Sequence, residues 1–152
     1  MRLATIRDGD GGTLAVRLDG DEAVELGDGD VGAVLRRADW REWAAAADGP
    51  RRPGADLDYA PLVPRPDKIV CVGLNYRSHI AETGRQPPEH PTLFAKYRSA
   101  LIGAHDEIVL PAVSDMVDWE AELAVIVGAP ARHVSPAEAV DRIAGYSVLN
   151  DV

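Results

Sequence analysis

The sequence lacks the cysteine pairs that form disulfides and the long apolar runs that cross membranes. Its 152 residues include one cysteine, Cys71, so no disulfide forms within the chain. A lone cysteine is typical of a reducing compartment. No stretch approaches the roughly 18 apolar residues of a membrane-spanning helix, and residues 1–8 lack the apolar core of a signal peptide. We therefore expect a cytoplasmic protein without a membrane partner.

Positive charge is also scarce. The chain carries 16 Lys and Arg against 25 Asp and Glu, a formal net charge of −9. Nucleic acids and anionic membranes require a basic surface, so this balance excludes them as expected partners. Hydrophobic residues make up 46% and charged residues 27% of the chain, which is typical of a globular protein with its own core.

The first part of the chain predicts a small α+β domain over residues 1–55. Short apolar segments alternate with Gly- and Asp-rich turns, which is typical of strands joined by hairpins. A helical pattern follows, and a segment rich in Pro, Gly and Arg then interrupts it. Strands are expected at 2–7, 13–18 and 23–26, the helix at 31–47, and a linker at 49–54.

The second part, residues 56–152, predicts a β-rich catalytic domain. Its first strand, 68–74, is continuously apolar and β-branched, as expected for a strand buried on both faces. Ser135, Pro136 and Glu138 form the pattern of a capping box with proline at the first helical position, which predicts a helix to about residue 143. A short helix is expected at 75–82, and further strands at 92–96, 107–110, 117–127 and 145–149.

Glu120 and Glu122 are the main candidate metal ligands. Strand residues at i and i+2 point to the same face, so the two carboxylates lie side by side and repel unless a cation or a proton neutralises them. A hard divalent cation is the simplest neutraliser. Asp151, at the end of another predicted strand, would complete a three-carboxylate site. The alternatives are the solvated outer row of an edge strand and, for Asp151, a plain turn.

His79, Glu82 and Lys96 are the candidate catalytic residues. His79 and Glu82, three positions apart on a helix, share a face, where the carboxylate would orient the imidazole as a general base. Lys96 follows an apolar strand and would hold a substrate carboxylate or enolate. The alternatives are a surface His/Glu pair and a lysine whose aliphatic stem lies along the strand end.

Six segments, in order, resemble the fumarylacetoacetate hydrolase family. The likeness is close over residues 61–152, and residues 1–60 resemble the variable N-terminal domain of bacterial members. In place of the Pro-Pro or Pro-Ser that follows the lysine in many members, this chain has Tyr97-Arg98. The matching segments are 68–76 (KIVCVGLNY, with His79 and Glu82), 91–96 (PTLFAK), 99–103 (SALIG), 108–111 (IVLP), 118–128 (DWEAELAVIVG) and 144–152 (AGYSVLNDV).

The resemblance implies a fold and a set of roles. The fold is a small α+β domain followed by part of a mixed β-roll that usually forms a homodimer. Mg²⁺ or Mn²⁺ would be bound by Glu120, Glu122 and Asp151. The His79/Glu82 dyad would activate water from a lid at 77–90, and Lys96 would line the substrate site with Asn75 and Tyr76. Because the family continues beyond the motif at 150–152, the resemblance also implies that the chain is truncated at its C-terminus.

The implied function is metal-dependent hydrolysis of a C–C bond in a β-diketone acid, such as an acylpyruvate or a fumarylacetoacetate-like compound. The metal would stabilise the enolate of the 2-oxo acid product. One alternative is isomerisation or decarboxylation of a hydroxymuconate-type diacid in aromatic catabolism. An alternative of another class is a catalytically silent oligomerisation or binding fragment.

Overall fold

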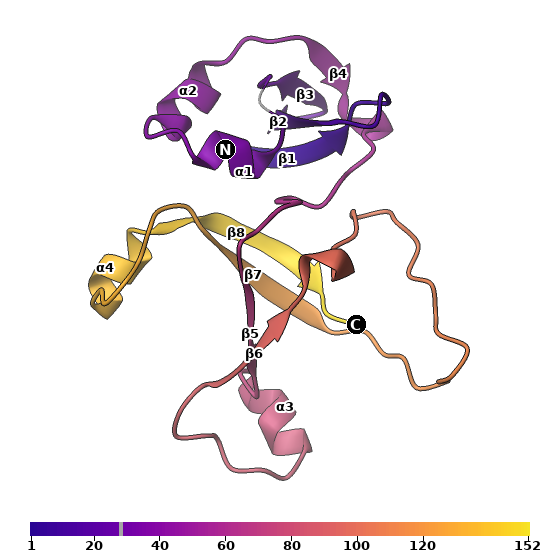
Figure 1. Ribbon diagram of the computed structural model, residues 1–152, viewed down its shortest axis with the longest axis vertical. Helices are drawn as coiled ribbons and strands as arrows, with labels where there is room; N and C mark the ends of the chain where they lie inside the picture. The colour runs from indigo at the N-terminus through magenta and orange to yellow at the C-terminus, as the bar shows by residue number, and fades with distance from the viewer. Residues whose placement is uncertain (28) are drawn as a thin grey trace.

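The computed structural model describes residues 1–27 and 29–152 as an α+β chain with three antiparallel sheets (Figure 1). A four-stranded N-terminal sheet has the order β1-β2-β3-β4, and two-stranded sheets pair β5 with β6 and β7 with β8. The strands are β1 (Arg2–Arg7), β2 (Thr13–Asp19), β3 (Glu22–Glu25), β4 (Arg51–Pro53), β5 (Ile69–Gly73), β6 (Thr92–Lys96), β7 (Ala121–Val127) and β8 (Ile143–Asn150). The helices are α1 (Val31–Leu35), α2 (Trp40–Ala46), α3 (Arg77–Glu82) and α4 (Pro136–Val140), with 3₁₀ turns η1 (Gly54–Asp56) and η2 (Arg98–Ala100).

The N-terminal sheet is covered on both faces. Alternate residues of an antiparallel pair face opposite sides, so Val16 and its neighbour Ala15 contribute to two separate cores. Ala15 packs with Val34 and Ala44 beneath α1 and α2. Val16 packs with Ile6 and with Leu57, which follows β4. Burial of these apolar side chains is the main source of stability for this unit.

Several expectations for the secondary structure and its burial were wrong in detail. The helix expected over 31–47 is two helices, because Asp39 disfavours a helix interior and the turn before it lets both helices reach the sheet. Part of the expected linker forms β4, which pairs with β3. Residues 107–110 form no strand, and β7 begins at residue 121 instead of 117. The helix after Ser135 ends at Val140 instead of about residue 143, because β8 begins at Ile143. Strand β5 is not buried on both faces, since Val70 and Val72 are exposed. The positions of the other predicted strands and the Ser135 capping box are confirmed.

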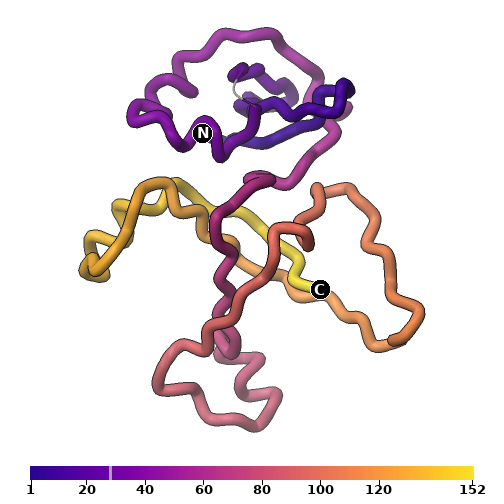
Figure 2. Tube along the Cα trace, in the orientation of Figure 1, coloured from indigo at the N-terminus to yellow at the C-terminus, as the bar shows by residue number. Residues whose placement is uncertain are grey.

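Polar contacts join the first and second parts of the chain. Buried Thr5 donates its hydroxyl hydrogen to the Leu62 carbonyl at 2.7 Å and accepts from the Val31 N–H at 3.0 Å. Figure 2 shows the chain passing from the N-terminal sheet into β5 through this region. Leu57 and Ala60 are buried with the first sheet, and the division at residue 55 stays a prediction. Within the described ranges 1–27 and 29–152, every helix is too short or too polar to cross a membrane.

Candidate active site

The carboxylates expected to bind metal lie where β7 begins and β8 ends. Ala121 pairs with Asn150, and beyond this pair the Asp151 N–H donates to the Glu120 carbonyl at 3.0 Å. In return the Glu120 N–H donates to Oδ1 of Asn150 at 2.9 Å. A side-chain amide therefore replaces the next ladder bond, which explains why β7 begins later than the sequence pattern predicted. These two bonds hold the backbones of Glu120 and Asp151 side by side.

The strand register determines which face these acids share. Glu122 pairs with Leu149, and opposed residues of an antiparallel pair lie on the same face. Because side chains alternate, Glu120 and Asp151, each two positions further, belong to that face too. It is the less exposed face of β7, since Glu122 is half-buried whereas Leu123 is exposed. Glu120 itself is exposed.

A lysine ammonium already contacts one of the predicted ligands. Lys96 Nζ lies 2.6 Å from Asp151 Oδ1 and donates to the Val152 carbonyl at 3.4 Å. The Asp151 side chain is only 12% exposed and that of Lys96 is 34% exposed. The hydrogen bond with Asp151 raises the pKa of Lys96, burial opposes the rise, and the negative charges of Asp151 and Glu120 add to it. Lys96 is therefore a firmly protonated cation beside the carboxylates.

The metal site expected from the sequence stays a prediction. Three carboxylates offer the hard oxygen donors that Mg²⁺ and Mn²⁺ prefer. Within residues 1–27 and 29–152, however, no three His, Cys, Asp or Glu side chains lie close enough together to hold a metal ion. The acids share a face and adjoining strand ends, but Asp151 is bound to Lys96.

Sequence reasoning did not single out Cys71 and Asn150 for this site. Cys71 is half-buried on β5. Its thiol pKa is raised by burial first and then by the charges of Asp151 and Glu122, whereas Lys96 lowers it. The thiol is therefore held protonated next to the site. No sequence signal singled out Cys71, because residues 68–74 are continuously apolar and alternate in burial only in the structure. No sequence pattern indicates that the Asn150 amide would bind Glu120.

Asn75 and Tyr76 follow β5 after a turn at Leu74, which has a positive φ of 54°. Asn75 is exposed. The Tyr76 hydroxyl accepts a hydrogen bond from the Leu123 N–H at 3.3 Å. Tyr76 therefore joins the end of β5 to β7, one residue from Glu122. Its predicted role in substrate binding remains untested.

The His79/Glu82 pair lies apart from the carboxylates. The helical spacing puts both on one side of α3, but His79 Nδ1 and Glu82 Oε2 are 3.9 Å apart, too far for a hydrogen bond. Both side chains are mostly exposed, 57% and 76%. Helix α3 follows the end of the β5–β6 hairpin where Gly73 pairs with Thr92, whereas Lys96 pairs with Ile69 at the other end (Figure 1). The predicted dyad is thus not assembled with the other site residues.

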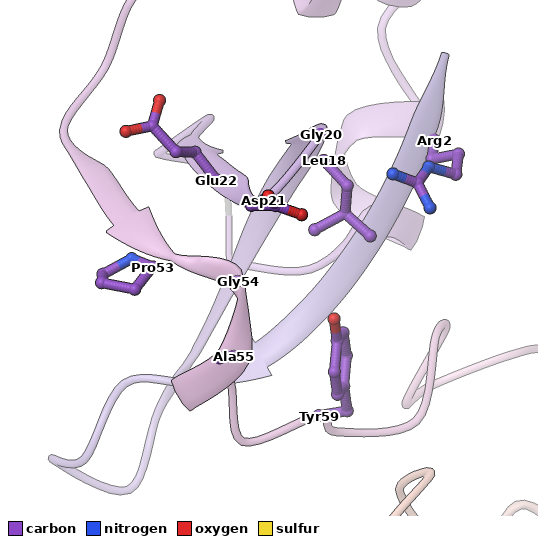
Figure 3. A pocket seen from close by; sticks show the side chains of 9 residues that line it. All are labelled: Arg2, Leu18, Gly20, Asp21, Glu22, Pro53, Gly54, Ala55 and Tyr59. Atoms are coloured by element: carbon purple, nitrogen blue, oxygen red, sulfur yellow. The ribbon is translucent and has the colours of Figure 1, made fainter.

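A separate hollow lies on the N-terminal sheet, between the β2–β3 turn and η1 (Figure 3). It has a volume of about 530 Å³, and Arg2, Leu18 and Tyr59 are among its lining residues. Figure 3 shows the Arg2 guanidinium and the Tyr59 hydroxyl on the same side of this hollow. None of the predicted site residues lines it. We therefore place the candidate chemistry at β6, β7 and β8.

Comparison with known proteins gives consistent results. Residues 68–152 match the family model for the fumarylacetoacetate (FAA) hydrolase C-terminal domain. The chain is 42% identical over 109 residues to the human mitochondrial oxaloacetate tautomerase FAHD2A, an overlap of 72% of this chain and 35% of the human protein. It therefore spans about a third of that relative.

Two solved structures share the fold. A 5-carboxymethyl-2-hydroxymuconate delta-isomerase from Mycobacterium smegmatis superposes with a TM-score of 0.72 at 31% identity, covering 99% of this chain and 54% of the isomerase. A maleylpyruvate hydrolase from Sphingobium, solved with manganese(II) and pyruvate, gives a TM-score of 0.75 at 29% identity, covering 99% and 58%. Both support the fold expected from the sequence, over about half of each structure.

Proposed function

The chain belongs to the fumarylacetoacetate hydrolase family, and from that premise we propose that the complete protein is a Mg²⁺- or Mn²⁺-dependent enzyme that hydrolyses a C–C bond in an acylpyruvate-like β-diketone acid. The observation that best supports this is the charged cluster at the ends of β6, β7 and β8. There Lys96 is paired with Asp151, and Glu120 and Glu122 belong to the same sheet face. Such a site suits a substrate with a carboxylate and a carbonyl.

Each residue then has a defined task. Glu120, Glu122 and Asp151 would hold the cation, which supplies Lewis-acid stabilisation of a developing enolate. Lys96 would bind the carboxylate of the 2-oxo acid. His79, oriented by Glu82, would accept a proton from water as the water oxygen bonds to the distal carbonyl carbon. The C–C bond then breaks, the acyl fragment leaves as a carboxylic acid that carries the water oxygen, and the electron pair of the bond becomes the enolate. The proton taken up by His79 then converts the enolate to the 2-oxo acid.

A second candidate is tautomerisation or isomerisation of a 2-oxo acid. The observation that favours it is the position of α3, since His79 and Glu82 are exposed and lie beyond the far end of the β5–β6 hairpin from Lys96. Enol–keto conversion moves a proton and breaks no C–C bond, so it does not need an assembled water-activating dyad. The human relative carries the name of a tautomerase.

Kinetics on the complete protein separate these reactions. Acylpyruvate cleavage and enol-oxaloacetate ketonisation are measured with Mn²⁺, and after its removal with a chelator. We expect His79→Ala to abolish cleavage, whereas Glu120→Gln should abolish both reactions. His133→Asn, at an exposed histidine between β7 and α4 and outside the predicted lid, is the matched control and should retain both.

Each contrary result has a clear meaning. Full cleavage by His79→Ala would disprove the hydrolytic role. Ketonisation without cleavage in the unmodified protein would favour the second candidate. The absence of both activities would favour a silent binding protein. The homodimer remains a prediction, which sedimentation of the complete protein would check.

A further inference from the structure

The contact between Lys96 and Asp151 raises the question of what happens to the lysine when a divalent cation binds. Lys96 Nζ lies 2.6 Å from Oδ1 of Asp151, whose side chain is 12% exposed. Glu120 lies beside Asp151, joined to it through the backbone bond of 3.0 Å. The ammonium is thus the cation that balances Asp151, and the negative charge of Glu120 also acts on it.

A divalent metal ligated by Asp151 would lie only a few ångströms from this ammonium. Two cations so close repel, and an Asp oxygen that is 2.6 Å from Nζ is poorly placed to donate to a metal. Lysine is a point charge on a flexible four-carbon stem, and a third of the Lys96 side chain is exposed, so the ammonium is able to move away. The backbone of Asp151 does not depend on Lys96, because Glu120 holds it.

We propose that Lys96 is a built-in counter-ion that competes with the divalent metal for Asp151, and that metal binding releases it towards the carboxylate of the substrate. This inference rests on the proposed metal site. It gives metal and substrate a defined order, because the lysine becomes free for an anion only after the metal has replaced it. A purely structural salt bridge predicts the opposite, namely that loss of Lys96 disorganises Asp151 and weakens metal binding.

Calorimetric titration of the complete protein with Mn²⁺ alone tests the competition. Lys96→Met should bind Mn²⁺ more tightly by roughly tenfold or more, the modest end of what removal of a juxtaposed like charge is worth. Lys96→Arg, which keeps the charge, should bind Mn²⁺ with the affinity of the unmodified protein. Lys68→Met is the matched control, since Lys68 and Lys96 are the two lysines of residues 1–152 and Lys68 is exposed before β5. It should leave the affinity unchanged.

A second measurement needs no substitution and so remains informative if Lys96→Met fails to fold. Amine acylation by an N-hydroxysuccinimide ester is followed at each lysine by mass spectrometry, with and without Mn²⁺. Acylation of Lys96 should rise severalfold with Mn²⁺, whereas that of Lys68 should not change. With oxalate, a dicarboxylate probe, added to the Mn²⁺-loaded protein, Lys96 should be protected again.

The outcomes distinguish this inference from the proposed function. Mn²⁺ affinity that is unchanged or weaker in folded Lys96→Met, or acylation of Lys96 that is insensitive to Mn²⁺, overturns the competition while leaving the metal site intact. If the unmodified protein binds no Mn²⁺, the metal site and the competition both fail.

Discussion

Arg7 in β1 and Asp106 in the loop after η2 form an ion pair, with Nη2 and Oδ2 2.6 Å apart, across 99 positions of sequence. The same guanidinium donates to Asp58 Oδ1 at 2.6 Å, and Asp106 Oδ2 also accepts from the Gly103 N–H at 2.6 Å. The loop that precedes Glu120 is therefore fastened to the N-terminal sheet.

This ion pair predicts a loss of stability in acid. The hydrogen bond from Arg7, and then that from the Gly103 N–H, hold the pKa of Asp106 below its usual value. A carboxyl with a lowered native pKa contributes stability above its unfolded pKa of about 4 and loses it as the pH falls through the lowered value. Asp106→Asn already lacks the charge at pH 7. In thermal unfolding, its Tm should therefore decrease less than that of the unmodified protein as the pH falls below 4. Asp115→Asn, an exposed acid of the same loop, should follow the unmodified protein; equal slopes for both variants would contradict the prediction.

Gly103 is predicted to tolerate no side chain. It is buried, and a Cβ there would overlap the carbonyl oxygen of Tyr59. Gly103→Ala should therefore destabilise by about 1–3 kcal/mol, the usual cost of overpacking, because backbone must shift. Gly145→Ala is the control, since a Cβ at that position meets nothing within 4 Å. Equal chemical denaturation midpoints for the two variants would disprove this interpretation of the contact.

The Thr5 hydroxyl is predicted to be necessary beneath α1. Thr5→Val keeps the shape but leaves the Leu62 carbonyl and the Val31 N–H without their present partner. An unsatisfied buried polar group costs about 1–3 kcal/mol, so the free energy of unfolding should decrease by that order. Thr13→Val, at the half-buried start of β2, should change it by much less. Denaturant titration of the two variants is the measurement.

These contacts show how far the sequence leads and where it stops. Apolar segments bounded by turn residues predicted most strands, and the Ser135 capping box predicted the start of α4, because those signals act within a few residues. The pairing of β4 with β3 and the Lys96–Asp151 ion pair were not predictable in this way, since each joins residues far apart in the chain. The spacing of His79 and Glu82 correctly indicated a shared side of α3. It carried no information on where α3 lies relative to Glu120 and Glu122.

The position of α3 leads to the last prediction, that residues 83–91 rearrange when substrate binds. All of these residues are exposed, and they form no helix or strand between α3 and β6. Their amides should therefore exchange hydrogen rapidly in the ligand-free complete protein.

For His79 to reach a substrate bound at Lys96, α3 and this segment must close over the β5–β6 hairpin, as lids do. Adding Mn²⁺ and oxalate should then slow exchange across residues 77–91 by tenfold or more, roughly a 1.4 kcal/mol change in the opening equilibrium. The buried amides of β2 serve as the reference and should not change. Strong protection of residues 83–91 before ligand is added, or no change after it, would mean that His79 acts from its present position or not at all.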